Sequence, residues 1–138
     1  MRKKILIIED NTQLLELTRL NLKAEGFSVV TATNGLEAID KARSAAPDLI
    51  LLDLALPEMD GFAVCESLRK DAATSEIPIL ILTGFAGELT RLASLDSGAS
   101  DYLTKPADPK ELLRKIKELL HAQPRSQPGP VALARNLR

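Results

Sequence analysis

The chain has a single cysteine, almost no net charge and no long hydrophobic run. Because Cys65 has no second cysteine to pair with, no internal disulfide can form, and we expect a reducing compartment. The net charge of −1 argues against direct binding to nucleic acid or to an anionic membrane surface. The apolar run at residues 5–8 is followed at once by acids, so it fits neither a signal peptide nor a membrane span. These absences favour a cytoplasmic globular protein.

The chain does contain a fivefold alternation of apolar, strand-like segments with amphipathic, helix-like ones. This alternation is typical of βα units built around a parallel sheet. The expected strands are 4–9, 28–32, 48–53, 77–83 and 100–104, and the expected helices are 12–26, 36–46, 62–70, 87–97 and 109–121. The residues at helical spacing are Leu14, Leu17 and Ala24 in the first helix, Val64, Cys65 and Leu68 in the third, and Leu89, Leu92 and Ala93 in the fourth.

The composition changes near the end of the last expected helix. Residues 123–130, QPRSQPGP, are rich in proline, glutamine and serine, as in a flexible linker. The segment VALARNLR that follows is too short to fold alone. We therefore expect one domain over residues 1–121 and a tail or linker over 122–138.

Reactive polar residues stand where four of the apolar segments end. These junctions are Glu9-Asp10 after residues 5–8, Asp53 after 48–52, Thr83 after 79–82 and Lys105-Pro106 after 101–104. In an open parallel sheet, ligands bind outside the carboxyl ends of the strands. One cleft would therefore gather three carboxylates, a hydroxyl and an ammonium. Carboxylates crowded in this way repel one another unless a cation joins them.

The residue types in this cleft favour phosphoryl chemistry. Magnesium prefers oxygen ligands and often bridges to phosphate, which suits the three acids. Lys105 can neutralise a carboxylate and bind phosphoryl oxygens. Taken alone, Asp53 is equally well explained as a turn former, and Thr83 is better explained as an ordinary strand residue. Taken together, carboxylate, magnesium and ammonium favour attack by an aspartate on phosphorus, which gives an acyl phosphate.

The motifs IIEDN, DLALPEMDG, ILTG and SGASDYLTKP, in this order and followed by a final helix, resemble the receiver domain of bacterial response regulators over residues 3–121. The resemblance implies an α/β fold, a flavodoxin-like (βα)5 three-layer sandwich with a parallel sheet of order 2-1-3-4-5. It also implies a phosphorylation-dependent signalling switch. Such a domain is not an enzyme in the usual sense, because it catalyses only its own phosphorylation and slow autodephosphorylation.

The same resemblance implies roles for individual residues around the phosphoryl group. Asp53 matches the phosphoacceptor, and Thr83 and Lys105 match the residues that bind the transferred group. Tyr102 matches an aromatic switch residue that turns inward when Thr83 moves.

The resemblance also implies a complete metal site. Glu9 and Asp10 match the acidic pair, with Asp10 as a direct Mg²⁺ ligand and Glu9 acting through water. Asp53 and the backbone carbonyl of Ala55 would supply the remaining protein ligands. Ala55 and Phe85 occupy positions beside the phosphate where many relatives carry polar side chains.

Partners follow from the resemblance as well. The donor would be a phosphohistidine on a sensor histidine kinase or a histidine phosphotransfer protein. The output surface would comprise the fourth helix, fifth strand and fifth helix, and would act on an unnamed target or a fused output domain. Ala107 follows Pro106, where DNA-binding relatives commonly have phenylalanine, so a phosphorylation-dependent dimer of their kind is left open.

Three alternative functions would each require features that this sequence lacks or would not require features that it has. A magnesium-dependent phosphohydrolase acting through an aspartyl phosphate would want a second aspartate two residues after Asp53, where Ala55 stands. A flavin-binding module would need a phosphate loop rich in serine, threonine or glycine after the first strand, whereas EDNTQ is acidic and GxGxxG is absent. A degenerate receiver that serves only as a scaffold would not be expected to keep the complete site.

Overall fold

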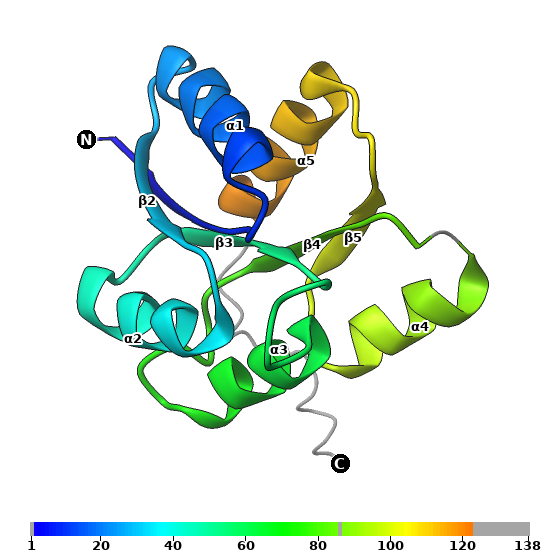
Figure 1. The fold of residues 1–138 in the computed structure, drawn as a ribbon. Coiled ribbons are helices and arrows are strands. Elements are labelled where there is room, and N and C mark those ends of the chain that lie inside the picture. The colour runs from blue at the N-terminus through cyan, green and yellow to red at the C-terminus, as the bar shows by residue number, and fades with distance from the viewer. Residues whose placement is uncertain (1, 86, 123–138) are drawn as a thin grey trace.

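A computed structural model describes residues 2–85 and 87–122, which fold into a five-stranded parallel sheet covered on both faces by helices (Figure 1). The strands are β1 Lys4–Ile8, β2 Ser28–Ala32, β3 Leu49–Asp53, β4 Ile79–Thr83 and β5 Asp101–Thr104, and the helices are α1 Thr12–Ala24, α2 Gly35–Ala45, α3 Gly61–Lys70, α4 Glu88–Asp96 and α5 Pro109–His121. The strand order 2-1-3-4-5 confirms the expected α/β sandwich. The expected tail at 122–138 lies outside the described residues except for Ala122, so the domain division stays a prediction.

The core consists of two apolar layers, one on each face of the sheet. In Figure 1, α1 and α5 cover one face while α2, α3 and α4 cover the other. Alternate residues of a strand point to opposite faces, so Ile5 and Ile7 pack towards α1 and α5, and Leu6 and Ile8 pack towards α2 and α3. Because both faces are covered, β1, β3 and β4 read as continuous apolar runs in the sequence.

The two ends of helix α1 are set by residues that cap its free backbone groups. Asn11 begins α1 by accepting a hydrogen bond from the Leu14 N–H, 3.0 Å long. Gly26 lies beyond the end of α1 with φ +97, a left-handed conformation that glycine adopts without strain, and its N–H donates to the carbonyl of Lys23. Within the described residues, no helix is both long and apolar enough to cross a membrane.

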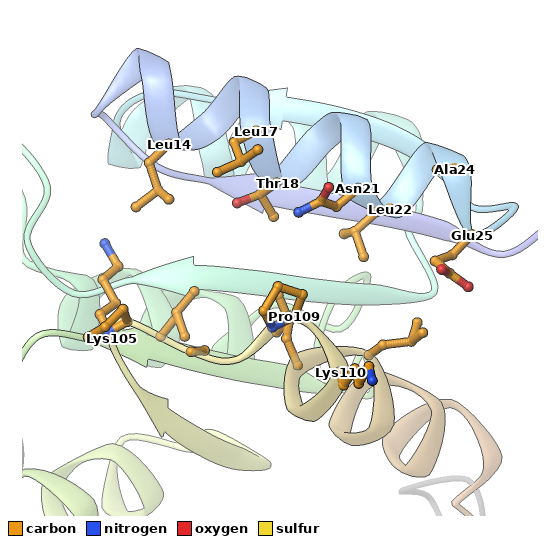
Figure 2. A pocket seen from close by; sticks show the side chains of 15 residues that line it. Leu14, Leu17, Thr18, Asn21, Leu22, Ala24, Glu25, Lys105, Pro109 and Lys110 are labelled. Atoms are coloured by element: carbon orange, nitrogen blue, oxygen red, sulfur yellow. The ribbon is translucent and has the colours of Figure 1, made fainter.

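Leu14, Leu17 and Ala24 stand at helical spacing, but they do not form the buried face of α1. The residues that pack on the sheet are Leu15 and Leu22, whereas Leu17 is 55% exposed. The stripe with Leu14, Leu17 and Ala24 instead lines one side of a groove between α1 and α5 (Figure 2). The helix carries two adjacent apolar stripes, and periodicity alone cannot tell which one meets the sheet.

Helix α4 is also oriented contrary to a simple apolar-inside rule. Leu89 and Leu92 point to solvent, with exposed fractions of 84% and 49%. The buried residues on this helix and at its end are Ser94 and Ser97, whose hydroxyls donate to main-chain carbonyls one turn back, at Thr90 and Ser94. The helix therefore packs on the body of the domain through small hydroxyl side chains and presents its leucines outwards.

The burial pattern of α1 predicts that truncating two leucines of this one helix changes the free energy of unfolding by very different amounts. Leu15→Ala should lower the free energy of unfolding by about 2–4 kcal/mol, because it removes a buried side chain and leaves a cavity. Leu17→Ala should cost less than about 1 kcal/mol, because the side chain is already half in solvent. Urea unfolding of both variants measures the difference. Equal losses would mean that the buried face of α1 has been assigned wrongly.

Candidate functional site

The strand order brings the four expected junctions to one edge of the sheet. Asp53 ends β3, which lies between β1 and β4, so its carboxylate takes the central position. Glu9 follows β1, and Thr83 ends β4. Lys105 follows β5, and its backbone N–H donates to the carbonyl of Thr83 over 2.6 Å. Parallel pairing thus places residues from four distant parts of the chain at a single site.

Three carboxylates form a compact acidic cluster at this edge. Each of Glu9, Asp10 and Asp53 offers an oxygen, and these oxygens all lie within 4.8 Å of one another. Glu9 and Asp53 are both only 5% exposed, whereas Asp10 is exposed. Oxygen donors at this spacing, two of them shielded from water, suit a hard divalent cation.

Lys105 bridges the two buried acids. Its Nζ lies 2.9 Å from Oε1 of Glu9 and 3.3 Å from Oδ2 of Asp53. The other oxygen of Glu9 accepts the backbone N–H of Asn11 over 3.2 Å. One ammonium therefore offsets part of the repulsion between two carboxylates, and the cluster as a whole keeps a negative excess.

The pKa values of Glu9 and Lys105 both depend on burial and on the charges of the cluster. Burial raises the pKa of Glu9 above its usual range, and the charge of Asp53 adds to the effect, while the hydrogen bonds from Lys105 and Asn11 oppose it. For Lys105, burial alone would lower the pKa, but the hydrogen bond to Glu9 and the charges of Asp53 and Glu9 outweigh it, so its pKa is raised. The lysine is therefore held charged, whereas the ionised form of Glu9 is destabilised in the folded protein.

The loop after Asp53 depends on a glycine. The N–H of Gly61 donates to the carbonyl of Leu54 over 3.0 Å, which folds the loop back on itself. A Cβ at Gly61 would lie 2.6 Å from the Cα of Leu54 and 2.9 Å from the carbonyl oxygen of Asp53, so no larger residue fits without a backbone shift. The sequence alone does not reveal this close approach. Ala55 is exposed beside Asp53, and its N–H donates to Oδ1 of that residue over 3.3 Å.

The remaining expected residues lie on β4 and β5. Thr83 is fully buried, and its Oγ1 accepts the N–H of Phe85 over 3.0 Å. Phe85 is 63% exposed. Tyr102 is half-buried on β5, opposite Ile81 in register, and packs against the core layer on the α2–α4 face. The Lys105-Pro106 peptide is cis.

The fold and the site together define a signalling domain of the phosphoacceptor class. The chain belongs to the response regulator receiver domain family, whose sequence model matches residues 5–117. It is thus a receiver domain of two-component signalling, a phosphoacceptor switch. The family is a signalling family, generally without catalysis on other molecules.

Known proteins agree with this assignment. The DNA-binding dual master transcriptional regulator RpaA of Synechocystis is 44% identical over 117 residues, which are 85% of this chain and 48% of that protein. The receiver domain protein (CheY-like) of Methanospirillum hungatei has a TM-score of 0.81 at 35% identity, over 87% of this chain and 94% of that one. The receiver domain of a sensor histidine kinase from Pseudomonas aeruginosa, solved with a magnesium ion coordinated in its active site cleft, has a TM-score of 0.82 at 30% identity, over 88% of this chain and 100% of that one. The chain spans about half the length of the curated relatives it matches.

Removing the bridging ammonium should make stability more dependent on pH. Because the pKa of Glu9 is raised on folding, its ionisation destabilises the fold above that pKa, and the cost disappears as pH falls and Glu9 is protonated. Lys105→Met keeps the aliphatic stem but leaves both acids uncompensated. In the presence of a chelator, the variant should lose about 1 kcal/mol more stability at about pH 7.5 than at about pH 4. Urea unfolding at the two pH values measures it, and a loss independent of pH would show that Lys105 does not neutralise the cluster.

Proposed function

We propose that Asp53 accepts a phosphoryl group from a phosphohistidine donor, and that Mg²⁺ is held by Glu9, Asp10, Asp53 and the carbonyl of Ala55. The observation that supports it most directly is the arrangement around Asp53. Its carboxylate is buried at the centre of the sheet edge, within 4.8 Å of two other acids and 3.3 Å from the ammonium of Lys105. The magnesium ion in the similar Pseudomonas receiver supports the choice of metal.

The chemistry follows from the positions of these groups. A carboxylate oxygen of Asp53 attacks phosphorus, the phosphorus–nitrogen bond to the donor histidine breaks, and an acyl phosphate forms. Magnesium, when bound, neutralises charge on the phosphoryl oxygens. Lys105 exchanges part of its contact with Asp53 for a phosphoryl oxygen. The hydroxyl of Thr83 already accepts the Phe85 N–H, so its own hydrogen can donate to another phosphoryl oxygen.

The receiver family implies a histidine kinase partner. The finer assignment, that the donor is a sensor histidine kinase or a histidine phosphotransfer protein, is part of the proposal. Because relatives such as RpaA are DNA-binding regulators about twice as long, a fused output domain is a natural route to the target. We infer that residues 1–121 form the receiver and act in the cytoplasm, and that residues 122–138 form a tail or linker. Residues 1–138 alone, with net charge −1, are not expected to bind nucleic acid.

The output would be a population shift of one face of the domain. Phosphorylation would draw Thr83 towards the phosphoryl group and let Tyr102 turn inwards, biasing the surface of α4, β5 and α5. The outward leucines of α4, Leu89 and Leu92, make this face suited to an apolar partner. A phosphorylation-dependent dimer through the face stays a prediction.

Phosphorylation should take place at Asp53 alone and should require magnesium. Phosphoramidate with magnesium should add one phosphoryl group to the wild-type chain, and Asp53→Asn should abolish the addition because the amide is not a nucleophile. Mass spectrometry of the intact protein measures the addition, and a chelator provides the metal control. Undiminished labelling of Asp53→Asn would reject the assignment of the acceptor.

The phosphoryl group should persist longer than in relatives with polar residues at the positions of Ala55 and Phe85. Hydrolysis needs a water in line with the bond from phosphorus to Asp53, and neither side chain can orient that water. The double variant Ala55→Asn with Phe85→Glu should therefore lose the group faster; orienting groups commonly contribute about 100-fold or more in general acid–base catalysis. Decay of the phosphoprotein after donor removal measures the rate. Unchanged decay, with magnesium saturating and the fold intact, would show that these positions do not limit water attack.

A further inference from the structure

An apolar groove runs between α1 and α5 and takes no part in the phosphoryl chemistry. We name it the α1–α5 groove; its main apolar walls are Leu14, Leu17 and Ala24 on one side and Pro109, Leu112 and Leu113 on the other. Its volume is about 610 Å³, the size of a site that buries a small ligand or a short peptide. Figure 2 shows the α1 side chains pointing across the groove, with Lys105 at one end and Glu25 and Lys110 at the other. An apolar groove between two helices is a candidate docking surface.

We propose that residues 131–138 of this chain, VALARNLR, dock in the α1–α5 groove. These residues lie outside the described part of the chain, and they carry all the aliphatic residues that follow Ala122. The inference goes beyond the proposed function and does not depend on it, because docking requires neither phosphorylation nor a metal.

The chain is long enough to make this contact. The last described residue, Ala122, directly follows α5, and the groove is lined by the first residues of that helix, Pro109 to Leu113. To return along α5, a helix of 13 residues, the chain must cover about 20 Å at a rise of about 1.5 Å per residue. Residues 123–130 include three prolines and can span about 25 Å at about 3.1 Å per residue. The tether therefore reaches the groove and is short enough to keep the local concentration of the segment high.

The segment also matches the groove chemically. On a helical turn, Leu133, Ala134 and Leu137 would share one face, which suits a groove walled by leucines. The segment carries two basic charges, Arg135 and Arg138, while the described residues that line the groove include one acid, Glu25, and two lysines, Lys105 and Lys110, so the match rests on apolar contact and not on charge. Because the groove ends at Lys105, a docked segment would lie beside the site and would compete with any partner that approaches Asp53 across α1 and α5.

A disulfide-trapping experiment on the full chain tests the proposal. Leu17→Cys places a thiol on the groove wall, and Leu133→Cys places one in the segment. The control pairs Leu133→Cys with Lys23→Cys, an exposed position on the same helix that does not line the groove. Neither position on α1 is buried, so both variants should fold, and the natural Cys65 is fully buried and should not compete. Mild oxidation in dilute solution, followed by peptide mapping, gives the initial rate of each disulfide within one chain.

Docking predicts that the pair at 17 and 133 closes at least about tenfold faster than the control pair, because the docked segment has a higher effective concentration at the groove. Adding Leu137→Asp to the first pair should reduce its rate to that of the control, since the contact is apolar. Equal rates for the two pairs would overturn the proposal. So would a disulfide that forms mainly between two chains, which would assign the groove to a second copy, and so would a fast rate that is insensitive to Leu137→Asp.

Discussion

The need to keep two buried carboxylates together at the edge of a sheet is the constraint on which the rest of the site depends. Glu9 and Asp53 are both shielded from water, and like charges so placed repel unless a cation lies between them. Lys105 supplies one such charge, with its ammonium within 3.3 Å of both acids. Burial and, to a smaller extent, the charge of Asp53 keep the pKa of Glu9 raised despite the hydrogen bond from Lys105. The side chains of the site are therefore already in place, but the carboxylates outnumber the positive charge, and this excess favours binding of a further cation.

The sheet makes this arrangement possible at little cost to the fold. The strand order places β1 and β4 on either side of β3, so the residues that end these strands meet without any long-range packing of loops. The hydrogen bond from the Lys105 N–H to the carbonyl of Thr83 ties the end of β5 to that of β4. Gly61 holds the loop after Asp53 close to the strand. A displacement of Thr83 would therefore also displace β5 and the helices beside it, as a conformational switch requires.

Much of the fold and the membership of the site could be predicted from the sequence, because both depend on features that repeat locally. Apolar strands ending in Glu9, Asp53, Thr83 and Lys105 are visible as a pattern, and parallel pairing brings such ends together. The comparisons confirm the family, while the separate roles of Asp53, Thr83, Tyr102 and the Ala55 carbonyl stay predictions.

The sequence was least informative about which face of a helix is buried. On α1 the sequence shows Leu14 and Leu17 at helical spacing, but Leu15 meets the sheet and Leu17 lines the groove. On α4 the leucines face outwards because Ser94 and Ser97 satisfy their hydroxyls within the helix and can therefore be buried. In both helices two faces were compatible with burial, and only the position of the neighbouring elements decided between them.

The most direct test of the account is thermal unfolding of wild type and Asp10→Asn with and without magnesium. Asp10 is exposed, so its replacement by an amide should leave the core intact while it removes one charge and one metal ligand. The account predicts that magnesium raises the melting temperature of the wild type; at a concentration of about 100 times the dissociation constant, linkage contributes about 2.7 kcal/mol. The variant should start from a higher metal-free melting temperature, because repulsion is reduced, and should gain less from magnesium. Equal gains in both proteins, or no gain in the wild type, would contradict the claim that this acidic cluster is completed by a divalent cation.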